Sequence, residues 1–416
     1  MQINNQEISQ EPINLWLNYF IKYYKFSSIS IGIVDKKNRY TFSYGYYDQE
    51  NKLEANESSN YLIASLSKIY TAIEVLKLME QKKLAFQDPV IKYIPEFIDK
   101  TVTIKDLLVH TAGLPRDGDF NFWLDKNSPT EEELIKHLKK IKIINKGTYK
   151  YSNLGYAILG LILELNSVQI SQKKISDFKS YNKWVFDKRN ENIFIDLKSF
   201  TPSFGLYKNI VEMTELIQKL LNKDQSLLSK ENFNEMFKVH LKIKGENEDD
   251  IAIPWEKWKG HNIYEFSGLG FGSASSILID FDKDISYTVL INCSQESNGF
   301  YFVRALRNYI NYCLENKIKI DWSSKLNGLY RNDDSDIMIF DCGDKIFTIN
   351  PEDTTPFHPD YLSEYSKIDE FKYSILRKEE GYLNEFATFE VDNKEKATLF
   401  KLGGWGYRKV EFDSII

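Results

Sequence analysis

The sequence predicts an α+β protein, in which an antiparallel sheet flanked by helices carries an inserted helical block and is followed by a small all-β domain. Two strand-rich segments lie on either side of a long helical stretch, and an amphipathic helix lies outside each of them. After about residue 322 the chain changes to short β-type runs. The 416 residues are therefore expected to form two domains, 1–320 with a helical insert at about 60–255, and 325–416.

The first segment begins with a helix over residues 11–25, because its apolar side chains recur at helical spacing. Two β-prone runs follow, residues 28–34 (SISIGIV) and 39–46 (RYTFSYGY). The polar sequence DKKN between them is typical of a hairpin turn. The segment is thus predicted to contribute a helix and two paired strands.

The central stretch is predicted to be mainly helical. A helix is expected to begin near Ser65 and to stop before Asp88-Pro89. The further predicted helices cover residues 103–111, 130–143, 154–166 and 208–222. Residues 275–280 and 285–292 then predict a second hairpin, and residues 300–315 a second flanking helix. If both hairpins belong to one sheet, a cleft is expected between that sheet and the helical block.

The composition excludes several classes of function. The net charge is −6 with acidic and basic residues mixed, so no nucleic-acid partner is expected. The longest apolar run, residues 156–165, is far shorter than the roughly 20 residues of a membrane span. The N-terminus lacks the pattern of a secretory signal, which leads us to expect a cytoplasmic protein.

The cysteines and histidines predict neither a disulfide framework nor a metal centre. Cys293, Cys313 and Cys342 are odd in number and widely spaced. The five histidines form no cluster with metal-ligand spacing, so neither a metal nor another cofactor is expected.

Ser65 and Lys68 form an S-x-x-K tetrad at the start of a predicted helix. Three residues apart on a helix, their side chains share one face, where a lysine of lowered pKa can take the proton of a serine nucleophile. The same spacing recurs at Ser171, Ser176 and Ser180, so the tetrad alone is weakly specific. Tyr151-Ser152-Asn153 adds a tyrosine that can share the proton relay and an amide that can orient Lys68 or a substrate carbonyl.

The context of these motifs resembles the serine β-lactamase-like family, which includes class C β-lactamases, penicillin-binding proteins, D-aminopeptidases and related esterases. The resemblance covers about residues 26–295, through YLIASLSKIYTAIEVLKLMEQ, VTIKDLLVHTAGLP and KGTYKYSNLGYAILGLILE. It implies that Ser65 is the nucleophile, Lys68 its base partner and Tyr151 the second proton-relay residue. Asn153 would support the substrate carbonyl, the Ser65 N–H would be one oxyanion donor, and His110 a packing residue.

The third motif of the family departs from the usual pattern. Members carry a Lys or His, then a small residue and Gly, whereas this chain has Phe266-Ser267-Gly268, with the Leu269 N–H as the second oxyanion donor. Phe266 cannot bind a carboxylate, and the esterase branch often has an aromatic residue here. His261, five residues upstream, is the candidate to replace the missing cation. The C-terminal runs resemble the lipocalin-like barrel appended to many members.

These features predict a serine hydrolase that acts on a small ester or amide through an acyl-enzyme, with an esterase or amidase favoured. A D-amino-acid peptidase, a β-lactamase or an acyltransferase of the same family remains an alternative. The substrate could then be a peptide, and an acyltransferase would pass the acyl group to an amine or an alcohol. An alternative of another class is a non-catalytic binding module that retains the pocket. The oligomeric state is left open.

Overall fold

The computed structural model describes residues 1–24, 26–48, 52–120, 128–170, 197–245, 249–292, 299–353, 356–358, 362–375, 386–402 and 405–410. The chain forms two compact units. One unit is the continuous stretch Ser27–Phe300, and the other combines Met1–Phe26 with Tyr301–Ile416. The division of the chain into domains 1–320 and 325–416 stays a prediction.

The unit Ser27–Phe300 contains one antiparallel sheet of eight strands. Its strands in spatial order are β5 (Leu53–Glu54), β4 (Arg39–Asp48), β3 (Ser28–Asp35), β12 (Ile285–Asn292), β11 (Ser273–Asp280), β10 (Ile263–Gly270), β9 (Glu256–Lys257) and β8 (Asp250–Ile251). The two predicted hairpins join where β3 pairs with β12, which places Ile31 opposite Val289. The predicted α+β class, with helices inserted between the two halves of one sheet, is confirmed.

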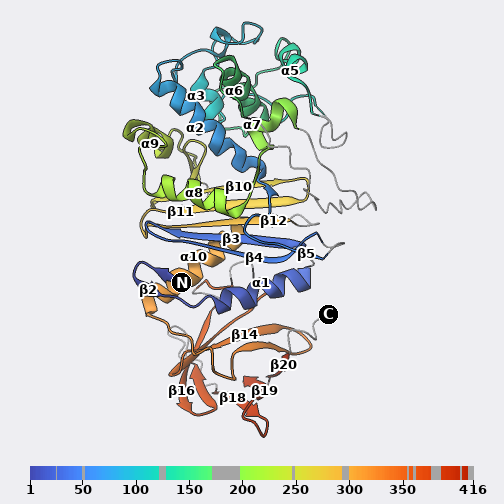
Figure 1. Cartoon of the computed structure of the whole chain (residues 1–416), viewed down its shortest axis with the longest axis vertical. Coiled ribbons are helices and arrows are strands. Elements are labelled where there is room, and N and C mark those ends of the chain that lie inside the picture. Colours follow the sequence, from blue (N-terminus) through green and yellow to red (C-terminus); the bar gives the residue numbers. More distant parts are fainter. Residues whose placement is uncertain are drawn as a thin grey trace. The chain divides into compact units, whose positions relative to one another are not determined.

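The helical block lies between β5 and β8 in the chain, and Figure 1 shows its helices gathered on one side of the sheet. Its elements are β6 (Tyr61–Leu62), η1 (Ala64–Leu66), α2 (Ser67–Glu80), η2 (Val90–Lys92), α3 (Ile104–Leu108), α5 (Glu131–Leu138), α6 (Asn153–Leu165), η3 (Lys198–Phe200), α7 (Thr201–Phe204), β7 (Tyr207–Lys208), α8 (Ile210–Leu221) and α9 (Lys230–Phe237). Helix α5 ends five residues before the predicted end at 143, because Ile141 and Ile143 alternate with lysines in an extended pattern.

Helix α8 packs directly on the sheet at Gly32 of β3. A Cβ atom at Gly32 would lie 2.3 Å from Cγ2 of Thr214 on α8. Every residue of β3, β11 and β12 is buried, which explains why these strands read as nearly continuous apolar and small residues. The sheet therefore gives the helical block a rigid base.

The second unit contains a closed antiparallel barrel of eight strands in sequential order. Its strands are β13 (Gly328–Arg331), β14 (Asp336–Asp341), β15 (Lys345–Ile349), β16 (Ser363–Asp369), β17 (Lys372–Ile375), β18 (Phe386–Val391), β19 (Ala397–Leu402) and β20 (Trp405–Val410). The unit also holds the hairpin β1 (Gln2–Ile3) and β2 (Gln6–Glu7), helix α1 (Glu11–Tyr24), and helix α10 (Gly299–Asn316) from its third residue onward. The ring of Phe302 packs on Trp16 and Phe20, with centroids 5.4 and 5.1 Å apart. The predicted all-β C-terminal part is confirmed as a barrel.

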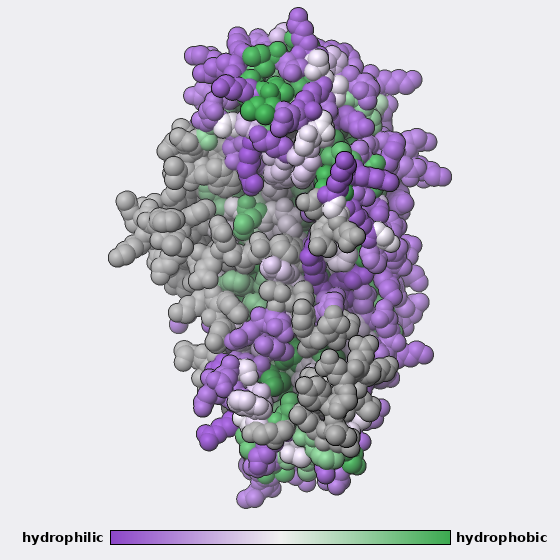
Figure 2. All heavy atoms as spheres, turned by 180° about the vertical axis from the view of Figure 1, so that it is seen from behind, coloured by the Kyte–Doolittle hydropathy of each residue, from purple (hydrophilic) through white to green (hydrophobic). Residues whose placement is uncertain are grey.

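The described surface is mainly polar on the face drawn in Figure 2, where hydrophobic residues form small, separate patches. Among the helices in the described ranges, none has the length and apolar character needed to cross a bilayer.

Candidate active site

Ser65 lies in the short turn η1, immediately before helix α2. The preceding residue, Ala64, has a left-handed backbone with φ of 46°, which costs about 1–2 kcal/mol for a residue other than glycine. Hydrogen bonds from Ser67 Oγ to Ala64 O (2.7 Å) and from Leu206 N to Ser67 Oγ (3.0 Å) hold this conformation. The turn that presents the candidate nucleophile is thus fixed by its own helix and by the chain near residue 206.

The sheet fixes the same turn from the other side. Ser273 and Ser275 of β11 donate hydrogen bonds through their hydroxyls to the carbonyls of Leu62 (2.6 Å) and Ile63 (2.7 Å). These two carbonyls belong to the residues that lead into η1, so the position of Ser65 is coupled to the strands of the sheet.

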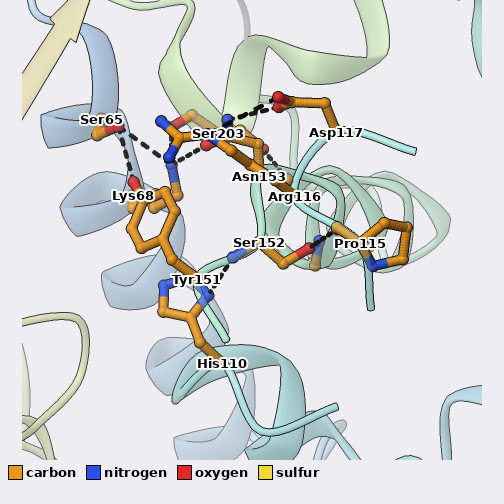
Figure 3. Close-up of polar contacts among 11 residues, drawn as sticks. Ser65, Lys68, His110, Pro115, Arg116, Asp117, Tyr151, Ser152, Asn153 and Ser203 are labelled. Carbon is orange, nitrogen blue, oxygen red and sulfur yellow. Dashed lines mark hydrogen bonds and ion pairs between the residues drawn. The ribbon is translucent and has the colours of Figure 1, made fainter. Parts of the chain in front are cut away.

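Lys68 lies on the first turn of α2 with its Nζ atom 3.4 Å from Ser65 Oγ (Figure 3). The same Nζ donates to Asn153 Oδ1 (2.7 Å) and to Ser203 O (2.8 Å). The side chain is fully buried, and burial together with the positive charge of Arg116 lowers the pKa of Lys68 well below its usual value. A neutral amine has two N–H donors, which these acceptors occupy, and its lone pair remains for the proton of Ser65.

The acceptor Ser203 O is a main-chain carbonyl whose place depends on close packing of two helices. It belongs to α7, and Pro202 beside it packs on Gly160 of α6. A Cβ atom at Gly160 would lie 2.3 Å from Cγ of Pro202, so only glycine allows this approach. The Ser203 hydroxyl in turn donates to Asn153 O, which ties α7 to the start of α6.

Tyr151 places its hydroxyl 2.8 Å from Ser65 Oγ, to which it donates a hydrogen bond. Burial is the main cause that raises the pKa of Tyr151, so the phenol stays protonated. His110 lies against the Tyr151 ring with the centroids 4.5 Å apart, and its Nδ1 accepts from the Ser152 N–H at 3.1 Å. Because burial lowers the pKa of His110 to about 3, this ring is neutral and acts as a packing partner.

Asn153 is oriented by a carboxylate that the sequence motifs did not reveal. Its Nδ2 donates to Asp117 Oδ1 at 2.7 Å, which turns the amide oxygen toward Lys68. Ser152 caps α6 by accepting from the Gly155 N–H. Arg116 and Asp117 directly follow the HTAGLP sequence, and an Arg-Asp pair after that signature was the signal that could have marked them.

Strand β10 brings the predicted third motif to the nucleophile at Gly268. A Cβ atom at Gly268 would lie 2.7 Å from the Ser65 nitrogen and equally close to Ile63 O. Phe266 is 4% exposed, and its ring packs edge-on against Trp255 at a centroid distance of 6.4 Å. Ser267 hydrogen-bonds Ser276 across the sheet (2.8 Å). Phe266 thus contributes to the hydrophobic core on this strand.

Leu269, the next residue, is 42% exposed and pairs with Ala274 of β11. The oxyanion role of the Ser65 and Leu269 N–H groups stays a prediction, and the close approach of β10 to Ser65 is compatible with it.

His261 does not lie at this end of β10. It lies in the turn that precedes the strand, and the five steps from Ile263 to Gly268 alone span roughly 16 Å at about 3.3 Å per residue. Its ring packs against Trp258 in an exposed turn. The expectation that His261 supplies a cation beside the nucleophile is therefore wrong, because the extended strand carries it away.

The structure brings Lys68 and Tyr151 together around the Ser65 hydroxyl, with Asn153 bound to Lys68 and Gly268 beside the Ser65 nitrogen. The competing tetrads that begin at Ser171, Ser176 and Ser180 lie outside the described residues, as does Cys293. The arrangement can deprotonate a serine through a neutral amine and can donate a proton from a phenol, which are the two transfers that acyl transfer needs.

Replacing Gly268 with alanine is expected to reduce the rate of Ser65 acylation by about 10-fold or more, since a shift of roughly 1 Å at a reacting group can cost 10²-fold. The added methyl group would displace either β10 or the Ser65 turn. Gly155→Ala is the matched control, because a Cβ atom there meets its nearest neighbour at an ordinary 3.6 Å. Equal labelling rates of both variants by an active-site serine probe would contradict the close fit at Gly268.

Comparison with known proteins finds similarity to the β-lactamase family and to penicillin-binding proteins. The family model described as Beta-lactamase matches residues 17–173. "Protein flp" of Staphylococcus aureus (strain COL) is 24% identical over 324 residues, which cover 69% of this chain and 64% of that protein. "Penicillin-binding protein 4*" of Bacillus subtilis (strain 168) is 32% identical over 134 residues, 30% of this chain and 29% of that protein. The chain thus spans less than two thirds of the length of these relatives.

Two solved structures share the fold. The octameric penicillin-binding protein homologue from Pyrococcus abyssi superposes with a TM-score of 0.62 at 18% identity. The match covers 97% of this chain and 100% of the homologue. A class C beta-lactamase reaches a TM-score of 0.59 at 15% identity over 71% of this chain and 94% of its own. Both matches concern the arrangement of helices and strands.

Proposed function

Because this chain belongs to the β-lactamase family, we propose that it is a serine hydrolase that cleaves small esters or amides through an acyl-enzyme on Ser65. One observation carries the proposal: a fully buried lysine amine and a tyrosine hydroxyl, 3.4 and 2.8 Å away, converge on the same serine oxygen. A surface serine has no such partners, and this convergence is what an activated nucleophile requires.

The geometry supports the following order of events. As Ser65 Oγ bonds to the substrate carbonyl carbon, its proton passes to the neutral amine of Lys68. When the bond to the leaving group breaks, the Tyr151 hydroxyl gives its proton to the departing oxygen or nitrogen, and the proton held by Lys68 restores the phenol. Water then attacks the acyl-enzyme, with the same two groups handling its protons.

An esterase or amidase is favoured over a β-lactamase or a D-amino-acid peptidase. In the family the third motif usually presents a cation from the strand beside the nucleophile, whereas Phe266 is apolar, buried and packed on Trp255. Strand β10 therefore offers its small residues and its backbone, and the acyl group is recognised without a charged side chain from this motif.

Labelling with a fluorophosphonate probe tests the proposal directly. We expect the folded protein to be modified on Ser65, as identified by mass spectrometry of the labelled peptide, and the Ser65→Ala variant to remain unlabelled. Heat-denatured protein is the control for nonspecific reaction. Absence of labelling in folded protein would favour a non-catalytic binding module.

Turnover of two chromogenic substrates then separates the hydrolase classes. We expect the protein to hydrolyse 4-nitrophenyl acetate, and kcat/KM for D-alanine 4-nitroanilide to be the lower of the two. The reverse order would assign the site to a D-amino-acid peptidase.

A further inference from the structure

Arg116 places a positive charge beside the candidate active site. Its side chain is 65% exposed, and its Cζ atom lies 5.4 Å from the centre of the Tyr151 ring. The hydroxyl of that ring is 2.8 Å from Ser65 Oγ. Figure 3 shows Arg116 in the same cluster as Lys68, Tyr151 and Asp117. A guanidinium that is accessible to solvent thus lies within a few ångströms of the groups that perform the proposed chemistry.

The backbone of Arg116 is held in place while its head group remains able to bind an anion. The carbonyl of Arg116 accepts from the Leu154 N–H at 3.0 Å, at the start of α6. Its Nε atom lies 3.8 Å from Asp117 Oδ2, which is longer than the roughly 2.7–2.9 Å of a charge-assisted hydrogen bond. A guanidinium carries five N–H donors, so one carboxylate at this distance leaves capacity for a second anion.

At both reacting groups, Arg116 has a larger influence on the pKa than any single nearby carboxylate. After burial, it is the largest influence on the pKa of Lys68, ahead of the opposing effect of Asp117. At Tyr151, after burial and the hydrogen bond to Ser65, the effect of Arg116 on the pKa is larger than those of Glu256 and Asp117. A negatively charged ligand group close to the guanidinium would be attracted by this charge.

The location of Arg116 also indicates which part of the substrate it faces. Tyr151 donates to the leaving group in the proposed mechanism, and Arg116 lies over the Tyr151 ring. We propose that Arg116 is the specificity-determining cation of this site and binds a carboxylate on the leaving-group side of the substrate. This inference rests on the proposed serine hydrolase function, and it assigns to a loop residue the task that Phe266 on β10 cannot perform.

A matched pair of esters tests this assignment. 3-Acetoxybenzoate and its methyl ester have the same acetyl group and differ in the charge of the leaving group. We expect the wild-type protein to favour the carboxylate, and Arg116→Ala to reduce the ratio of the two kcat/KM values by about 10-fold or more, the effect of one hydrogen bond to a charged group. Arg116→Lys should retain part of the preference, since it keeps the charge and loses the bidentate geometry.

Arg39→Ala is the matched control, because it removes an equally charged side chain, paired with Glu215 at 3.2 Å, from the same unit. Its ratio should equal that of the wild type. If Arg116→Ala lowers kcat/KM for both esters equally, Arg116 acts through Lys68 and Tyr151 alone and the proposal is overturned. A wild-type protein that neither hydrolyses the methyl ester nor reacts with a fluorophosphonate would instead refute the hydrolase function itself.

Discussion

Replacing Lys68 with alanine is expected to slow acylation of Ser65 by about 10³-fold or more, within the range for loss of a general base together with its positioning. The amine is the group near Ser65 Oγ that can accept a proton, since burial and Arg116 lower its pKa while Tyr151 stays protonated. The rate of fluorophosphonate labelling measures this step directly. In the wild type the rate should also fall with decreasing pH as Lys68 becomes protonated, and the variant should lose this dependence.

Two further variants make the Lys68 result specific. Lys77→Ala removes another lysine of α2, one that pairs with Glu74 at 2.8 Å, and should label at the wild-type rate. Lys68→Met keeps much of the buried volume, so a similar loss of labelling in both Lys68 variants, with unchanged circular dichroism, separates catalysis from folding. Labelling of Lys68→Ala at a near wild-type rate would remove this residue from the mechanism.

Substitution of Tyr151 by phenylalanine is expected to lower kcat/KM for 4-nitrophenyl acetate by about 10²-fold, the lower end of the range for general acid–base catalysis. The change removes the hydroxyl that contacts Ser65 Oγ at 2.8 Å and keeps the ring that packs on His110 and under Arg116. The loss should therefore be in rate, with thermal stability nearly preserved.

Tyr149→Phe is the control for this variant, because the Tyr149 ring also contacts His110, edge-on at 6.0 Å. It should hydrolyse the ester like the wild type. Equal activity of Tyr151→Phe and Tyr149→Phe would show that the Tyr151 hydroxyl is dispensable for hydrolysis of this ester.

The parts of the site that could be predicted from the sequence are those that local geometry determines. Ser65 and Lys68 are three residues apart at a helix start, so their contact follows from the helical repeat. Tyr151 was placed with them by resemblance, through the order and spacing of the motifs. The two hairpins of the sheet could also be predicted, because the pattern of apolar residues within each strand depends on which of that strand's own residues are buried.

The missed parts depend on contacts between distant segments. Asp117 orients Asn153 from 36 residues away, and neither residue type predicts the other as its partner. His261 is near the third motif in sequence and distant in space, since an extended strand separates residues faster than any other regular structure. Arg116 lies in a loop, where the apolar residues have no regular spacing. The sequence therefore does not indicate which way its side chain points.

The carbonyl of Ser203 that accepts from Lys68 has a consequence for how this site can change by mutation. Every residue type carries a main-chain carbonyl, so a substitution at position 203 leaves the acceptor for Lys68 in place. Such a substitution tests only the side-chain hydroxyl that donates to Asn153 O. The position of the carbonyl depends instead on Gly160, because only a residue without a side chain lets Pro202 approach so closely. A mutational scan should therefore find that substitutions of Gly160 and single-residue insertions in α7 impair the activity that depends on Lys68. Small replacements at position 203 itself should be tolerated.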